Sequence, residues 1–450
     1  IEAAAAYSLR NLSDSYAGNV VEVRRSSDNA VRSFTAAEVT DGTLTTWVLG
    51  DAASLVGKAQ YFNGTNSKVG FGDVLNKNGS TAFFIEATIR PENALLSSIV
   101  DKQAAAPNYQ GYAFRVIGGE LQFTIGSAAT NRITVVTAGA NLNDGAVHVC
   151  RVTYDGSKSG SGVSFLVDGV SQSVSIAVDA FTGNSTSSGI NLAIGIRDID
   201  GLVPFKGIIY AVNINDQAAY TGLGATPWAD TIGSNNGTPS NVVSFTGQGL
   251  DGTVSKWYDQ STTSGVPNAN HAVQTDAAKQ PKIVDGGSLV TDGLDFSSDF
   301  LVASSVSGLT GSLSMLAVSK RDSSGNVVSL SSSSSSGRYF AIQELAATST
   351  VNIRNPTTVN VSDNVSGSTR LTFALTTGAT STSVGANGSA VTTTSSDYGN
   401  DFSGTNVNQI AIGLLRTVSP TGYFNGRIKE IIIYNSDQTD NRTALEANIG

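Results

Sequence analysis

The sequence predicts an all-β protein made of two jelly-roll β-sandwiches, with a short helix near each end of the chain. Composition is the first observation behind this fold class. Of the 450 residues, 48 are glycine and only 14 % are charged, which is typical of short strands joined by many turns. The second observation is a regular alternation of apolar and polar residues, and the third is that the same series of segments occurs twice.

Charge and composition exclude several function classes. The net charge is −9 and no run of Lys or Arg is present, so we expect no nucleic-acid partner. The single cysteine excludes an internal disulfide framework and metal sites built on several thiolates. No stretch of about 18 consecutive apolar residues occurs, so we expect no membrane insertion.

The first 50 residues are predicted to form a helix and strand segment that packs on the second sandwich. Ala3–Leu12 is rich in alanine, which favours a short helix. Val20–Arg24 alternates like a strand, and Phe34–Trp47 is interpreted as a loop with short strands.

Residues 51–218 are predicted to form the first sandwich, which is inserted between the N-terminal segment and the second sandwich. Phe83–Ile89 alternates apolar and more polar positions with a period of two, as a half-buried strand does. The strand around Val149–Thr153 ends at Asp155-Gly156, and Asp168-Gly169 is typical of a tight hairpin turn.

Residues 250–450 repeat this order and are predicted to form the second sandwich. Asn387-Gly388 lies 219 positions after Asp168-Gly169. Gly426 lies 219 positions after Gly207. Such matches at a nearly constant offset indicate two copies of one antiparallel domain.

Two further segments complete the predicted organisation. Residues 219–249 contain Gly, Asn and Pro without clear periodicity and are interpreted as a connector. Gln438–Ile449 is predicted to form the C-terminal helix, in which Arg442 and Glu446 have the spacing of an ion pair.

Four groups of residues resemble the concanavalin A-like, laminin-G-type jelly roll. They are Phe83–Pro91, His148 with Val152–Gly156, Val167–Val170 and Phe205–Ile209. The resemblance covers about residues 51 to 216 and, more weakly, 285 to 437. It implies two concanavalin A-like jelly rolls and says little about function.

A second resemblance joins two distant parts of the chain. Ala6–Arg10, Tyr16–Gly18 and Val23–Asn29 resemble the opening of a block found in phage virion proteins, and that block continues as Trp257–Ser261 and Gln280–Val284. The resemblance therefore implies a virion structural protein in which the first sandwich interrupts the second domain.

The same block is also similar to the catalytic domain of β-sandwich α-arabinofuranosidases. In that family cysteines flank the Trp-Tyr-Asp-Gln element and a later strand supplies a glutamate nucleophile. This chain has no cysteine at the flanking positions, and in the strand that we would match, the first acid after Gly337 is Glu344. The departures from the family pattern argue against hydrolase activity.

No catalytic residue is predicted. Hydrolysis of a glycosidic bond needs two carboxylates about 5–10 Å apart, and the acids considered are Glu86, Glu120, Asp101 and Asp259. Glu86 is expected on the outward face of its strand, and His148 and His271 are interpreted as structural rather than catalytic.

No cofactor is predicted, although calcium is a candidate. The jelly-roll resemblance implies that loop carboxylates can hold one calcium ion. The oxygen ligands considered are Asp101, Asp198 and Asp200.

The densest cluster of aromatic and charged residues has two interpretations. Its members are Arg24, Arg25, Asp28, Trp257, Tyr258 and Asp259. In one interpretation the aromatic side chains stack a sugar ring, with Arg and Asp binding its hydroxyls. We favour the other, in which Arg24 or Arg25 pairs with Asp259 and fastens the N-terminal segment to the second sandwich.

From these resemblances we expect a non-enzymatic virion structural protein, such as a tail fibre, head fibre or decoration component of the extracellular particle. Expected partners are other virion proteins and further copies of the chain, with host-surface glycans as ligands of the lectin-like domains. Two alternatives from other classes stay open: a secreted arabinofuranosidase-like glycoside hydrolase or carbohydrate-binding module, and a bacterial surface adhesin.

Overall fold

The structure, a computed structural model, divides the chain into two compact units. Unit 1 comprises residues 1–48 and 250–450, and unit 2 comprises residues 49–249. The structure describes residues 2–92, 95–182, 187–221, 228–263, 266–267, 269–304, 306, 309, 311–334, 339–345, 348–354, 358–364, 369–377, 381–395 and 407–449. Unit 2 thus interrupts unit 1 in the sequence.

Unit 2 is a sandwich of two antiparallel sheets around one apolar core. The first sheet has the order β13 (Val170–Ser171), β12 (Val163–Val167), β11 (His148–Tyr154), β6 (Phe83–Pro91), β16 (Lys206–Ile214), β4 (Gln60–Asn63) and β19 (Val243–Ser244), with β17 (Ala218–Thr221) also beside β16. The second has the order β14 (Val174–Asp179), β10 (Asn131–Thr137), β9 (Glu120–Ala128), β8 (Gly111–Ile117), β7 (Ser97–Gln103), β15 (Leu192–Ile194), β5 (Lys68–Gly72) and β18 (Thr238–Ser240).

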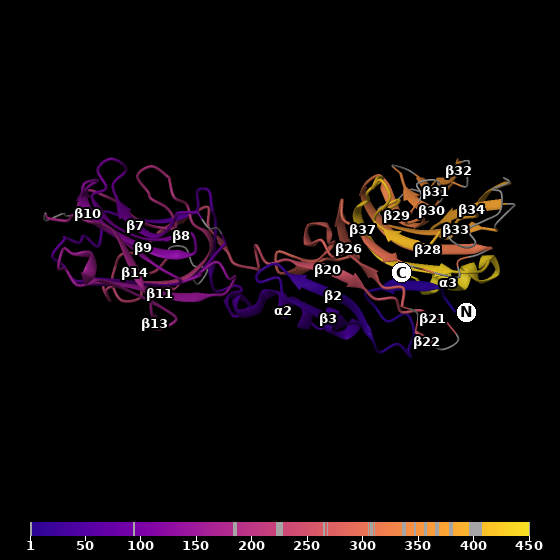
Figure 1. Cartoon of the computed structure of the whole chain (residues 1–450), viewed down its shortest axis with the longest axis horizontal. Helices are drawn as coiled ribbons and strands as arrows, with labels where there is room; N and C mark the ends of the chain where they lie inside the picture. The colour runs from indigo at the N-terminus through magenta and orange to yellow at the C-terminus, as the bar shows by residue number, and fades with distance from the viewer. Residues whose placement is uncertain are drawn as a thin grey trace. The chain divides into compact units, whose positions relative to one another are not determined.

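Unit 1 contains the same two series of strands. One runs β35 (Thr392–Ser395), β34 (Ser381–Ala386), β33 (Arg370–Thr376), β28 (Leu313–Ser323), β37 (Asn425–Tyr434) and β26 (Leu294–Ser297). The other runs β32 (Thr358–Asn364), β31 (Thr348–Arg354), β30 (Tyr339–Glu344), β29 (Gly325–Ser331), β36 (Gln409–Ile412) and β27 (Leu301–Ser304). Figure 1 labels most of these strands.

Further strands and short helices of unit 1 lie outside these two series. They are β2 (Asn19–Arg25), β3 (Val31–Thr35), β20 (Gly252–Trp257), β23 (Ala272–Val273), β24 (Lys282–Asp285) and β25 (Ser288–Leu289), with α1 (Ala36–Thr40), α2 (Thr43–Leu49), α3 (Arg442–Asn448) and the hairpin β21 (Thr262–Thr263) and β22 (Val266–Pro267). Single 3₁₀ turns lie at Gly50–Leu55, Gly160–Gly162, Ala277–Lys279 and Thr439–Asn441.

Matching turns show that the two sandwiches are copies of one fold. Asp168 and Asn387 both have positive φ, 51° and 52°. Each side-chain oxygen accepts a hydrogen bond from the second residue of the neighbouring strand, Val149 N–H of β11 in one copy and Leu371 N–H of β33 in the other. The prediction of an all-β protein with two jelly-roll sandwiches is confirmed.

The predicted N-terminal helix is wrong, because Ala5–Ser8 forms strand β1 and pairs with β37. In unit 2 the equivalent position beside β16 is filled by β17, which follows β16 directly. The small side chains of Ala5 and Ala6 are buried on opposite faces of the sheet. Burial in a vacant strand position outweighs the few tenths of a kcal/mol per residue by which alanine favours a helix.

Two other predictions are corrected. Residues 219–249 are not a connector, since they supply β18 and β19, and most of β17, as edge strands of unit 2. Phe34–Trp47 contains helices α1 and α2 rather than short strands, apart from the end of β3. Thr35 and Glu38 form a capping box that starts α1, a pattern that the sequence shows but that we interpreted as loop. The predicted C-terminal helix is present as α3.

No helix within the described residues is both long and apolar enough to cross a membrane.

Candidate functional site

The two halves of the split block lie together in unit 1. Strand β20 pairs with β2, which places Trp257 opposite Val21. The Trp257 ring is buried and lies 5.8 Å from the ring of Tyr7, between ring centroids. Strand β1 therefore lies beside the end of β20, and the residues after Trp257 reach the N-terminal segment.

Asp259 is one of the groups that bind the N-terminal segment. Its Oδ1 accepts hydrogen bonds from the N–H of Ala6 at 2.9 Å, from the N–H of Ser261 at 2.9 Å and from the hydroxyl of Ser261 at 2.7 Å. Its side chain is buried. Burial raises the pKa of the Asp259 carboxyl, although the hydrogen bonds from Ser261 and Ala6 oppose this shift.

Gln260 binds the same segment further along. Its Nε2 donates to the carbonyl oxygens of Ser8 and Arg10 at 2.8 and 2.9 Å, and its Oε1 accepts from the N–H of Leu12 at 3.0 Å. The amide thus satisfies three backbone groups that have no strand partner, which fixes the path of residues 8–12.

The predicted pairing of Arg24 or Arg25 with Asp259 is wrong. The register of β2 and β20 places Arg25 opposite Gly252, about 20 Å along an extended chain from Asp259. The carboxylate partner of Arg25 is instead Asp28, at 2.6 Å. Arg24 donates to the carbonyl oxygen of Asn29.

The side chain of Tyr258 has partners other than those of Arg25 and Asp259. Its ring packs against His271, with ring centroids 4.9 Å apart, and its hydroxyl is 2.9 Å from the hydroxyl of Ser33. The structure therefore separates the predicted cluster into three places. Arg25 and Asp28 form a turn, Trp257 and Asp259 belong to a site that fastens the N-terminal segment, and Tyr258 packs against His271.

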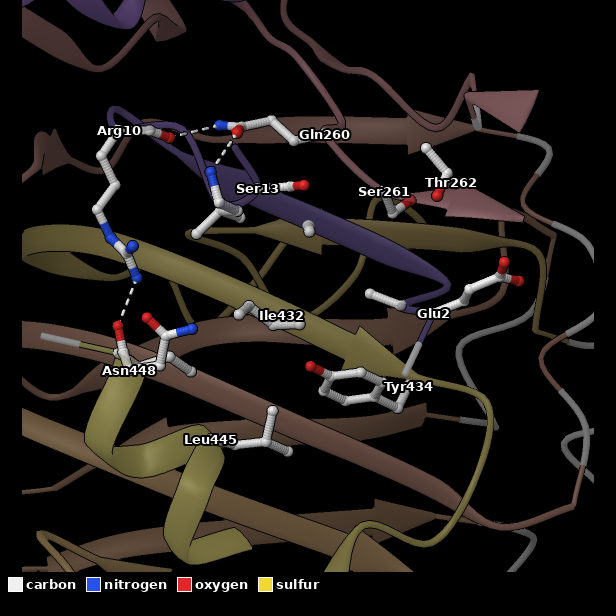
Figure 2. A pocket seen from close by; sticks show the side chains of 14 residues that line it. Glu2, Arg10, Ser13, Gln260, Ser261, Thr262, Ile432, Tyr434, Leu445 and Asn448 are labelled. Carbon is white, nitrogen blue, oxygen red and sulfur yellow. Dashed lines mark hydrogen bonds between the residues drawn. The ribbon is translucent and has the colours of Figure 1, made fainter. Parts of the chain in front are cut away.

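A pocket of about 370 Å³ lies between the N-terminal segment, the end of β37 and helix α3 (Figure 2). It is lined by Glu2, Ala3, Ala6, Arg10, Leu12, Ser13, Gln260, Ser261, Thr262, Ile432, Tyr434, Leu445, Asn448 and Ile449. Its volume is within the range of small-molecule sites, which is roughly 300–1,000 Å³.

The pocket has an apolar floor because β37 presents alternate residues to the outer face of its sheet. Ile432 and Tyr434 lie on that face, and Leu445 and Ile449 cover it from the C-terminal helix and the residue after it. Ala6 belongs to the same apolar cluster. The side chain of Tyr434 is buried, and burial raises the pKa of its phenol, as does the charge of Glu430.

The polar side chains that line the pocket differ in whether they already form hydrogen bonds within the protein. Within the described part of the chain, the hydroxyls of Thr262 and Tyr434 and the side-chain amide of Asn448 make no hydrogen bond. These groups are neutral and can both donate and accept hydrogen bonds. They are therefore available to the hydroxyls of a ligand.

The charged side chain of Arg10 is engaged by its own protein. Its Nε donates to Glu430 Oε2 and its Nη2 to Glu430 Oε1, both at 2.9 Å, and Nη2 also donates to the carbonyl oxygen of Asn448 at 2.7 Å. Glu430 is buried and also accepts from the hydroxyl of Ser8 at 3.0 Å.

The three acids considered as calcium ligands each have other partners. Asp101 pairs with Arg115 at 2.6 Å, Asp200 with Arg197 at 2.7 Å, and Asp198 with Lys68. Within the described ranges, no group of three or more Asp, Glu, His or Cys side chains is arranged to hold a metal ion.

The other acids and histidines are likewise placed in local networks. Glu86 faces outward beside Arg151, at 3.4 Å, and Glu120 accepts hydrogen bonds from the last residue of β10 and from the loop after it. His148 lies between Asp144 and Asp168, at 3.0 and 2.8 Å. The Nδ1 of His271 accepts a hydrogen bond from the N–H of Asp259.

Residues 63–220 match the model of the concanavalin A-like lectin/glucanases superfamily of laminin-G type. This segment lies within unit 2 and covers about a third of the chain. Unit 2 is therefore a lectin-like β-sandwich of the concanavalin A-like, laminin-G type.

Solved structures with a similar fold are distant. Domains LG4-5 of the mouse laminin α1 chain are 13 % identical, with a TM-score of 0.32 and coverage of 84 % of this chain and 89 % of that chain. The CBM40 domain of the Ruminococcus gnavus IT-sialidase, bound to α2,3-sialyllactose, is 17 % identical, with a TM-score of 0.28 and coverage of 31 % and 84 %. No curated protein matches.

Most of the pocket is not predicted by the sequence. Gln260 belongs to the Trp-Tyr-Asp-Gln element, but Arg10, Tyr434, Thr262 and Asn448 are not among the predicted site residues. They come from four separate parts of the chain, and none forms a motif with its neighbours. The alternation Glu430, Ile432, Tyr434 on one face of a strand was the detectable pattern.

Proposed function

We propose that this protein is a non-enzymatic, glycan-binding structural component of a virion, and that the pocket of unit 1 is its sugar site. The observation that carries the sugar site is the combination of a partly apolar floor with neutral hydrogen-bonding groups at Thr262, Tyr434 and Asn448. Sugar rings present apolar C–H faces and a rim of hydroxyls, so such a lining is complementary to them.

The lining also favours binding over hydrolysis. Among the lining residues that the structure describes, Glu2 is the single carboxylic acid, whereas the usual glycosidase mechanism needs two carboxylates that face each other across the bond. Glu430 lies beneath the pocket but is ion-paired with Arg10. This arrangement supports a lectin-like role rather than the arabinofuranosidase alternative.

The virion assignment rests on the resemblance of the split block and not on the pocket. In support of it, the residues of the block fasten the N-terminal segment to the second sandwich. We propose that several copies of the chain form a homo-oligomer within the particle, since virion components assemble symmetrically. Multi-angle light scattering of the purified chain tests this part, because a strictly monomeric chain would contradict it.

Binding of neutral sugars, measured by isothermal titration calorimetry on the full chain, tests the site. Replacing Thr262→Ala and Tyr434→Phe removes two hydroxyls while keeping the size of the pocket wall. We expect a combined loss of at least tenfold in affinity, since each hydrogen bond contributes about 1 kcal/mol. Thr153→Ala, at an exposed strand position in unit 2, is the matched control and should leave binding unchanged.

A further inference from the structure

The cation of the pocket is already neutralised, and this limits what the pocket can bind. Arg10 is the single Arg or Lys among the described residues that line the pocket. Three of its five N–H donors are committed, two to Glu430 and one to the carbonyl oxygen of Asn448. The pairing with Glu430 is bidentate, which is the strongest geometry for these two groups.

Glu430 is held in this role by its surroundings. It lies on the same outer face of β37 as Ile432 and Tyr434 and is only 1 % exposed. The hydroxyl of Ser8, in the paired strand β1, donates to the same Oε2 that binds Arg10. A carboxylate that is buried this deeply depends on its cation, because an unpaired buried charge is strongly destabilising.

We infer that the pocket selects uncharged sugars, and that Glu430 is the residue that sets this specificity. The inference rests on the proposed sugar site and adds the class of sugar that the site accepts. A sugar carboxylate that binds Arg10 through its two uncommitted N–H groups shares the cation with Glu430, and the buried charge of Glu430 is then only partly compensated. If it does not recruit Arg10, it meets only the neutral groups of Thr262, Tyr434 and Asn448, with the carboxylate of Glu2 also in the lining.

The balance of charge follows from the same residues. The charges of Arg10 and Glu430 cancel, and the other charged residue of the described lining, Glu2, is an acid. The whole chain carries a net charge of −9. Long-range electrostatics therefore also disfavours an anionic ligand.

The test uses pairs of sugars that differ only by the charge. Glucose and glucuronic acid share one ring, as do galactose and galacturonic acid, and in each pair a CH₂OH group is replaced by a carboxylate. Each sugar is titrated into the full chain at neutral pH by calorimetry. For the wild-type protein we expect the neutral member of a pair to bind at least about tenfold more tightly than its acid.

Two variants then separate the role of Glu430 from general effects on folding. In Glu430→Gln the amide oxygen can still accept a hydrogen bond from Arg10, but the positive charge of Arg10 is no longer compensated. The preference for the neutral sugar should therefore fall to within about threefold. In the double variant Arg10→Gln with Glu430→Gln no cation is available, so the preference should return to at least tenfold. Thermal unfolding of both variants shows whether unit 1 remains folded.

The outcomes distinguish the inference from the proposed function. If the wild-type chain binds the acid as tightly as the neutral sugar, or if Glu430→Gln remains folded with an unchanged preference, the inference is wrong and the sugar site stands. If Glu430→Gln does not fold, the wild-type pairs still decide whether the pocket selects neutral sugars, and a folded double variant that has lost the preference would contradict the inference. If no neutral or acidic sugar binds to the wild-type chain, the proposed sugar site and the inference both fail.

Discussion

The Oδ1 atom of Asp259 accepts a hydrogen bond at 2.9 Å from the backbone N–H of Ala6, 253 positions earlier in the sequence. Unit 2 lies between the two residues in the chain, so this bond and those of Gln260 connect the two halves of unit 1. The N-terminal strand is thereby held against β37, where it forms one wall of the pocket.

Asp259→Ala should loosen the N-terminal segment. The change removes the acceptor for Ala6 and Ser261 in a buried place, and hydrogen bonds to charged groups contribute about 1.5–3 kcal/mol each. We expect unit 1 to lose about 2–3 kcal/mol of stability and the backbone amides of residues 4–12 to exchange faster with solvent. Hydrogen exchange followed by mass spectrometry measures this effect.

Asp28→Ala is the matched control for Asp259→Ala. Asp28 pairs with Arg25 in a partly exposed turn, where ion pairs contribute about 0–1 kcal/mol. Asp28→Ala should leave the hydrogen exchange of residues 4–12 unchanged. Equal exchange rates in the Asp259→Ala variant and the wild-type protein would contradict the fastening role of Asp259.

Substitution of equivalent glycines by alanine should be equally destabilising in the two sandwiches. Gly207 and Gly426 have φ values of 127° and 141°, and a Cβ on either would collide with the carbonyl oxygen of Arg90 or Lys320. We expect Gly207→Ala to destabilise unit 2 and Gly426→Ala to destabilise unit 1, each by about 3 kcal/mol, from the unfavourable φ and the overlap together.

The control for these glycines is Gly57→Ala, since Gly57 also has positive φ but has open space where a Cβ would lie. It should cost about 1 kcal/mol. Chemical denaturation of the variants gives the free energy of unfolding, and similar costs at all three positions would argue against the close backbone approach.

The two histidines should give opposite pH dependences of stability. Burial by itself lowers the pKa of His148, but its hydrogen bonds to Asp168 and Asp144 outweigh this and raise the pKa above 6.5. The stabilisation by His148 is thus fully present below about pH 6.5 and is lost as the pH rises through the pKa of the folded state. His148→Gln should remove this loss of stability.

For His271 the sign is reversed. Burial lowers the pKa of its ring, and the charge of Lys256 adds to this, while Asp259 opposes it. The folded state therefore binds fewer protons, and His271 should destabilise unit 1 as the pH falls below about 6.5. Unfolding of His148→Gln and His271→Gln between pH 5 and pH 8 tests both signs, and parallel pH profiles for the two variants would contradict the prediction.

Removing one partner of the buried ion pair between Arg370 and Glu344 should strongly destabilise unit 1. Both side chains are nearly fully buried, and the Ser349 and Thr372 hydroxyls also donate to Glu344. Burial raises the pKa of Glu344, against the effect of Arg370. Arg370→Met leaves the carboxyl without its cation and should cost about 3–5 kcal/mol.

A double variant separates the pair from the space that it fills. Replacing Glu344→Gln together with Arg370→Met removes the buried charge, so most of the lost stability should return. A double variant that is as unstable as the sum of the two single variants would show that the charges are not coupled.

The fold class followed from local features of the sequence. Phe83–Pro91 alternates because one face of β6 is in the core, and Asp168-Gly169 and Asn387-Gly388 mark equivalent turns because few residues accept positive φ. These features depend only on neighbours in the chain, and the fixed offset between the copies made the repeat visible without a structure.

The tertiary structure alone decided which distant segments pair and which of their side chains are in contact. Ala5–Ser8 looks helical by propensity, yet it is a strand because β37 has a free edge that β17 fills in the other copy. Arg25 and Asp259 looked like partners, but the register of β2 and β20 separates them. The pocket, too, exists only because Arg10, Thr262, Tyr434 and Asn448 meet in space. Hydrogen bonding and burial across more than 200 residues determine these contacts, and no local pattern encodes them.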